Sequence, residues 1–208
     1  MHGLVLRAPV MLVMLMAPSG ATLAQCPDRE ALEKGGTAHV SYPDGSVVGL
    51  RWMGAGVVEE TTRHGNEGQA FRMLSMGGVF IFDEVDLEGM AEIAASRIVT
   101  RYPDTLFERL PITAGTEMTL TAVSSFADGT EPEVERITLR SGALDEVDIA
   151  GCRYSGFPML LTYEGDDSRF TSMMTHLPAL GLSLEIARLG QGTAPLSFVP
   201  QRFDLSPP

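Results

Sequence analysis

The chain has 208 residues and a formal net charge of −12 at pH 7, from 15 basic and 27 acidic side chains. A surface this acidic repels phosphate backbones and anionic lipid headgroups, and no run of Lys and Arg offsets it locally. The composition therefore argues against nucleic acid as a partner, and the length suits one sizeable domain.

The first 24 residues are predicted to be a signal peptide. Arg7 precedes the apolar run 8–17, which is too short to span a bilayer comfortably, and small residues follow it. We expect cleavage near Ala24/Gln25 and a periplasmic or secreted mature chain with no transmembrane segment. The sequence before Cys26 also resembles a lipoprotein signal, but Gln25 stands where Gly, Ala or Ser is expected, which favours a soluble exported protein.

Cys26 and Cys152 are the two cysteines of the chain, and we expect them to form a disulfide. In an oxidising compartment, two cysteines at opposite ends of a domain most simply pair with each other. In the chain-entropy model, closing so long a loop is worth about 4 to 5 kcal/mol. The alternative is a redox or nucleophilic thiol, for which the chain lacks a Cys-x-x-Cys motif.

The first elements after Cys26 are a short helix and a series of strands. The helix is predicted over 27–34, because Pro and acidic residues come first and a Gly pair follows. A tight turn at Pro43-Asp44-Gly45 is typical of a hairpin. The strands expected in this half are 37–42, 46–52, 57–63, 69–76 and 79–86.

Residues 87–115 are expected to link two possible halves, 37–86 and 116–190. Helical spacing in 87–98 competes with a strand that ends at Pro103, so both alternatives stay open. After this linker, the turn SFADGT between strands 116–126 and 133–140 repeats the form of SYPDGS in the first half. Either the halves are similar or, more simply, both turns use the Asp-Gly that this turn type prefers.

The stretch 151–181 is predicted to contain a hairpin with arms 159–164 and 169–176. If Glu164 pairs with Arg169, alternation places the larger apolar side chains on one face, as in an antiparallel sheet with one packed side. A further strand is expected over 182–189, and the Pro- and Gly-rich segment 191–208 is expected to be a loosely packed surface tail.

These patterns predict an all-β fold. We expect residues 25–190 to form a single β domain, mainly an antiparallel meander in a sandwich or partly open barrel, with one or two short helices.

The sequence contains none of the usual catalytic motifs. His39, His64 and His176 remain after cleavage, and no acid or Ser lies at a spacing that makes any of them a catalytic partner. The acidic runs 83–88 and 164–167 lack the ligand spacing of a calcium loop, so no metal or other cofactor is predicted.

Methionine and aromatic residues on the predicted strands suggest a groove for an apolar ligand, because Met side chains adapt to irregular shapes. The alternative is that the same side chains fill an ordinary core. The groove residues on this hypothesis are Trp52, Met73, Phe80, Phe82, Met159 and Met174.

Four short motifs carry a resemblance to known proteins. They are Cys26-Pro27, the aromatic-Pro-Asp-Gly turn, Gly-Cys152-x-Tyr154 and the corner 176–181 (HLPALG). Together they resemble a group of exported proteins from Gram-negative bacteria in which a Cys-x-Tyr strand precedes a hairpin and a Pro-x-Leu-Gly corner. The resemblance implies export and β architecture, and it implies no activity.

We therefore predict a non-enzymatic exported protein that binds an apolar small molecule or an envelope protein partner on one sheet face. One alternative is a hydrolase in which His39, His64 or His176 meets an acid or a Ser in a pocket. Another is a purely structural envelope protein.

Overall fold

A computed structural model describes residues 25–65, 68–166 and 168–206, and these residues are almost entirely β-structure. The predicted signal peptide lies outside the described residues. The strands form one sheet in the order β14-β13-β12-β11-β9-β8-β7-β5-β4-β3-β2-β1-β15, with β6 beside β5 and β10 beside β11. The sheet is not closed into a barrel, and the predicted all-β class is confirmed.

The strands of the first half are β1 Thr37–Ser41, β2 Val47–Gly54, β3 Val57–Arg63, β4 Ala70–Met76, β5 Phe80–Glu88, β6 Ala91–Glu92 and β7 Ile98–Arg101. Those of the second half are β8 Glu117–Phe126, β9 Glu133–Ser141, β10 Asp145–Ile149, β11 Cys152–Glu164, β12 Arg169–Leu177, β13 Leu182–Gly190, β14 Leu196–Ser197 and β15 Arg202–Ser206. The helical segments are α1 Arg29–Glu33 and the 3-10 turns η1 Ala94–Ser96 and η2 Asp104–Arg109.

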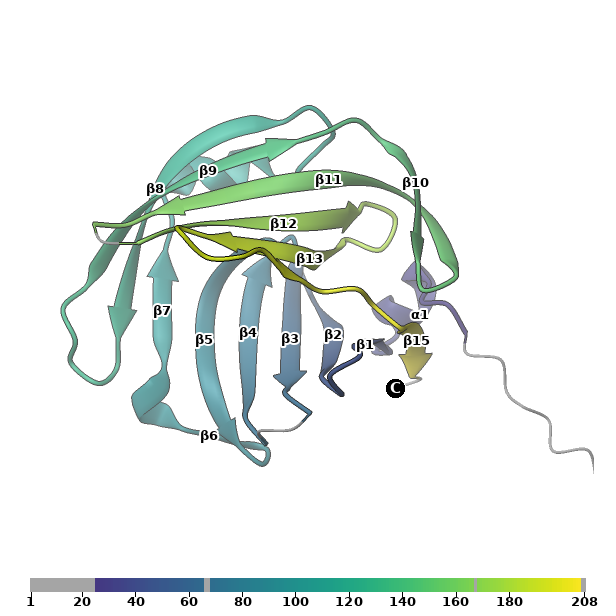
Figure 1. Cartoon of the computed structure of the whole chain (residues 1–208), viewed down its shortest axis with the longest axis horizontal. Coiled ribbons are helices and arrows are strands. Elements are labelled where there is room, and N and C mark those ends of the chain that lie inside the picture. The colour runs from purple at the N-terminus through teal and green to yellow at the C-terminus, as the bar shows by residue number, and fades with distance from the viewer. Residues whose placement is uncertain (1–24, 66–67, 167, 207–208) are drawn as a thin grey trace, which may run out of the picture.

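The sheet folds over so that its two halves face each other. In Figure 1, β2–β5 and β7 stand below a layer that contains β9 and β11–β13. Apolar side chains fill the space between the layers in two main clusters, one containing Leu50, Val58 and Leu182, the other Phe80, Leu139 and Phe157. We call the side of each strand that carries these core residues the inner face, and the opposite side the outer face.

The two Asp-Gly turns have the same local geometry. Asp44 accepts hydrogen bonds from the backbone N–H and hydroxyl of Ser46, both at 2.9 Å, and Asp128 accepts one from the N–H of Thr130 at 2.9 Å. Gly45 lies at φ +83° and Gly129 at +87°, a region that glycine enters without steric cost. Both turns join neighbouring antiparallel strands, as predicted.

The predicted hairpin register between β11 and β12 is confirmed. Glu164 pairs with Arg169, Tyr163 with Phe170 and Met159 with Met174. The rings of Tyr163 and Phe170 stack with centroids 4.5 Å apart, which places both on the inner face together with Met159.

The linker after β5 consists of short strands and 3-10 turns rather than an α-helix. Its residues form β6, η1 and β7, and β7 connects the halves by pairing with both β5 and β8. Of the two alternatives for this segment, the strand ending before Pro103 is therefore right. Helical spacing in 87–98 was misleading because sheet pairing, a long-range interaction, decided the local structure.

The C-terminal segment corrects the expectation of a surface tail. Its strand β15 pairs with β1 along five residues, and Phe203 is buried in the first core cluster with an exposed fraction of 2 %. The alternation Arg202-Phe203-Asp204-Leu205 is a strand pattern, and the Pro and Gly content of the surrounding segment obscured it.

The predicted disulfide between Cys26 and Cys152 is confirmed. The two Cα atoms are 5.7 Å apart across a sequence separation of 126 residues. The hydroxyl of Tyr154 donates to the carbonyl oxygen of Pro27 at 2.9 Å, beside the disulfide. The segment that precedes α1 is thus fastened to the start of β11.

Replacing both cysteines, Cys26→Ser with Cys152→Ala, is expected to lower the free energy of unfolding by about 2 to 5 kcal/mol, because the denatured chain loses a long closed loop. Urea denaturation monitored by circular dichroism measures this. Wild-type protein under reducing conditions is the control and should show the same loss. Equal stability of the oxidised wild type and the double variant would contradict a stabilising role of the disulfide.

Candidate functional site

The inner face carries a set of apolar side chains that are not fully buried. These side chains point toward the core side of the sheet yet remain only partly buried. Their strands are β4, β11 and β12. Tyr163 follows the core residue Leu161 by two positions, and Met174 pairs with the core residue Met159. We call this set the inner-face patch, and its members are Phe71, Met73, Tyr163, Phe170 and Met174.

Two carboxylates adjoin the inner-face patch. Glu60 on β3 pairs with Met73 on β4, which pairs with Glu84 on β5, so the three side chains form a row across the strands. Glu60 accepts a hydrogen bond from the hydroxyl of Thr62 at 3.1 Å. Neither Glu60 nor Glu84 makes an ion pair within the described residues.

The other layer contributes one cation to this region. Arg188 on β13 forms an ion pair with Glu185 at 2.7 Å, and Glu185 also accepts from the hydroxyl of Ser172 at 2.8 Å. The guanidinium of Arg188 lies 5.7 Å from the ring centroid of Phe170. Its charge is therefore largely committed to Glu185, which leaves the carboxylates of β3 and β5 without full compensation.

Burial raises the pKa of Glu60 to about 7, and the negative charges of Glu185 and Glu84 add to the rise. The hydrogen bond from Thr62 and the charge of Arg188 act in the opposite direction. Burial also raises the pKa of Glu84, with a contribution from Asp86. The inner-face patch thus has beside it a carboxyl group that gains and loses a proton near neutral pH.

The structure divides the six predicted groove residues between surface and core. Phe80 and Met159 are each only 1 % exposed and belong to the second core cluster. Trp52 lies elsewhere, under the guanidinium of Arg29 at 3.4 Å, and Phe82 is a partly buried residue of β5. Met73 and Met174 are the two that belong to the inner-face patch. That they line a ligand groove remains a prediction.

Sequence reasoning missed Glu60 and the stacked rings of Tyr163 and Phe170 as candidate site residues. Glu60 lies two residues after the buried Val58 on β3, so alternation alone places it on the core side. A packed face was predicted for the hairpin that holds Tyr163 and Phe170, but neither ring was considered as part of a site. The period of two along a strand is the signal that would have identified Glu60 and both rings.

The three histidines lie at separate places. The Nδ1 atom of His176 is 2.8 Å from the hydroxyl of Ser183, and both residues are 4 % exposed. Burial lowers the pKa of His176 to about 4, so its ring is neutral at pH 7. His39 lies on β1 opposite Gly49, and His64 is near Phe71 with ring centroids 5.7 Å apart. The buried His–Ser pair has the surroundings of a structural hydrogen bond.

Within residues 25–206, apart from the undescribed positions, no group of three or more His, Cys, Asp and Glu side chains is arranged to hold a metal ion. None of the helices described is long and apolar enough to cross a membrane.

Comparisons with known proteins give one structural neighbour. No family model and no curated protein matches the chain. Among solved structures, the hypothetical lipoprotein YmcC from Escherichia coli K12 aligns with a TM-score of 0.45 and 14% identity, over 84% of this chain and 88% of that one. We draw no argument from an alignment with a TM-score below 0.5. The resemblance of the sequence motifs to exported Gram-negative proteins remains a prediction.

The variant Glu60→Gln is expected to raise the free energy of unfolding by about 1 to 3 kcal/mol at pH 8 and to leave it unchanged at pH 4. Burial raises the folded-state pKa of Glu60 from its ordinary value of 4.5 to about 7. The stability that the protonated carboxyl contributes is fully present below pH 4.5 and is lost as the pH rises through 7. Because the amide of Gln carries no charge at any of these pH values, the variant does not lose this stability.

Urea denaturation at the two pH values measures this difference. The control is Glu131→Gln, an exposed residue beside the β8–β9 turn, which should change stability little at either pH. An effect of Glu60→Gln that is the same at pH 4 and pH 8 would contradict the assignment.

Proposed function

We propose that the mature chain is a non-enzymatic exported protein that binds an apolar small molecule on the inner face of its sheet. The observation that carries this proposal is the inner-face patch, whose five apolar side chains face the core side yet stay partly exposed. Small-molecule sites in proteins are lined mainly by such side chains, with a few polar groups that orient the ligand.

The chemistry of the patch suits a ligand of variable shape. Methionines at positions 73 and 174 adapt to irregular apolar surfaces, and the stacked rings of Tyr163 and Phe170 offer a rigid one. Glu60 beside Met73 supplies a hydrogen-bonding group that is a donor when protonated and an acceptor when ionised. An apolar molecule with one polar end matches this combination.

The disulfide supports export. Disulfides of this kind persist in oxidising compartments such as the periplasm, and Cys26 and Cys152 are joined across most of the chain. The predicted signal peptide, which lies outside the described residues, points to the same destination.

Native mass spectrometry of protein purified from the periplasm tests for a bound ligand directly, since an apolar ligand should appear as an added mass. The neutral fluorescent probe N-phenyl-1-naphthylamine tests the place. We expect the double variant Met73→Ala with Phe170→Ala to weaken probe binding at least tenfold, about 1.4 kcal/mol, because it removes two apolar surfaces of the patch.

The matched control is Leu160→Ala on the outer face of β11, an exposed apolar residue outside the patch, which should leave probe binding unchanged. Circular dichroism confirms that each variant is folded. A bare mass together with no probe binding would overturn the proposal and favour a structural or partner-binding role.

A further inference from the structure

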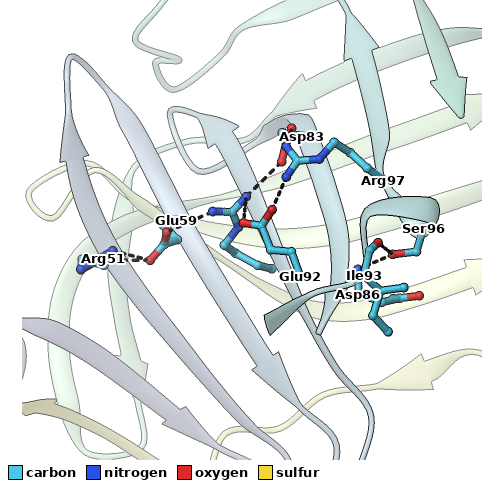
Figure 2. A network of polar contacts seen from close by, with 9 residues as sticks. Arg51, Glu59, Asp83, Asp86, Glu92, Ile93, Ser96 and Arg97 are labelled. Carbon is cyan, nitrogen blue, oxygen red and sulfur yellow. Dashed lines mark hydrogen bonds and ion pairs between the residues drawn. The ribbon is translucent and has the colours of Figure 1, made fainter. Parts of the chain in front are cut away.

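Six charged side chains form a continuous ion-pair network on the outer face of β2–β7. Figure 2 shows Arg51 at one end of it and Arg97 at the other, with acidic side chains between them. Arg51 contacts Glu59 at 2.8 Å, and Arg97 contacts Asp83 at 2.7 Å. Arg72 occupies the middle, 3.3 Å from Asp83 and 4.0 Å from Glu59. The sixth member is Glu92, so three positive and three negative groups balance.

Glu92 differs from the other two acids in its position. Glu59 and Asp83 lie on central strands, and their side chains are 15 % and 13 % exposed. Glu92 is 37 % exposed and comes from β6, a two-residue strand that pairs only with the end of β5. The turn between β5 and β6 contains Gly89 at φ +65°, with no atom near its missing Cβ. In this hairpin β6 pairs with β5 at two positions only, and the tip residue Met90 contacts Arg63.

The carboxylate of Glu92 bridges two arginines. It lies 2.9 Å from the guanidinium of Arg72 and also forms an ion pair with Arg97. Guanidinium groups recognise planar carboxylates and phosphates through paired N–H donors. Removing the Glu92 carboxylate would leave the network with one uncompensated positive charge at this point, and the Nε of Arg72 is already buried without a hydrogen-bond partner.

A further arginine adjoins this pair. A surface depression of about 260 Å³ is lined by Arg97 and Arg101 together with Val99, Ser125 and Phe126. Arg101 is exposed and makes no ion pair within the described part of the chain. A molecule with its anionic group at Arg72 and Arg97 has space beside it for an uncharged portion in this depression, which Arg101, a third cation, also lines.

We propose that Arg72 and Arg97 form a binding site for a carboxylate or phosphate group, and that Glu92 is an internal substitute for this ligand. The β5–β6 hairpin then acts as a latch, which swings away from the arginines when an external oxyanion replaces Glu92. Because Glu92 is tethered, it competes at a high effective concentration, and the external ligand binds the wild type weakly. This site is on the outer face and is independent of the inner-face patch.

The test is a calorimetric titration of the full mature chain with inorganic phosphate and, separately, acetate, at constant ionic strength. We expect Glu92→Gln to bind at least one of the two anions at least tenfold more tightly than the wild type, because the competing charge is removed. The anion that binds more tightly identifies whether the site prefers a phosphate or a carboxylate group. Adding Arg97→Gln to this variant should abolish the gain.

The control variant is Glu117→Gln, which frees Arg140 from a single exposed ion pair without creating a pair of arginines. Binding by Glu92→Gln that is no tighter than that of the wild type or of this control would overturn the proposal.

A second measurement does not depend on any variant. The N–H of Ile93 donates to the carbonyl oxygen of Asp86 at 2.9 Å and reports on the closed hairpin. Hydrogen exchange at Ile93 in the wild type should accelerate at saturating phosphate or acetate compared with chloride of equal ionic strength. Unchanged exchange at this amide would contradict release of the hairpin.

Discussion

The packing of the two halves of one sheet against each other is the constraint on which the rest of the structure depends. An antiparallel sheet with one apolar face has to bury that face, and here the only large partner in the described chain is the other half of the same sheet. The core clusters around Leu50 and Phe157 meet this need. The inner-face patch consists of inner-face side chains that this packing buries only partly, so the candidate site follows from how the sheet folds.

The acidic residues on the two faces of β3–β5 differ in their charge partners. On the outer face, Glu59 and Asp83 have arginine partners, and these ion pairs keep their charges compensated. On the inner face, Glu60 and Glu84 share one distant cation that is already paired, and burial favours their protonated forms. Glu59 and Glu60 are neighbours in sequence, as are Asp83 and Glu84. Strand alternation gives the first of each pair an arginine partner on the outer face and places the second on the inner face without an ion pair in the described residues.

Features that depend on local chemistry could be predicted from the sequence. Asp44-Gly45 specified its turn, Glu164 with Arg169 fixed a register, and two cysteines left one simple pairing. Features that depend on distant contacts could not: β15 is a strand because β1 lies beside it, and β6 and β7 are strands because they pair with β5 and β8. Glu60 was missed because the groove residues were sought among Met and aromatic side chains, whereas its position two residues after the buried Val58 places it on the inner face.

The junction between the halves is a narrow part of the sheet. The strands β5 and β7 share only two paired positions, Asp83 with Val99 and Glu84 with Ile98. Ion pairs from Arg97 to Asp83 and to Glu92 cross or adjoin this junction on the outer face, where backbone pairing is sparse. Because the ladder contributes little here, these charged contacts add a larger share of the cohesion than surface ion pairs usually do. Anything that displaces Glu92 therefore acts at the junction that joins the two halves of the sheet.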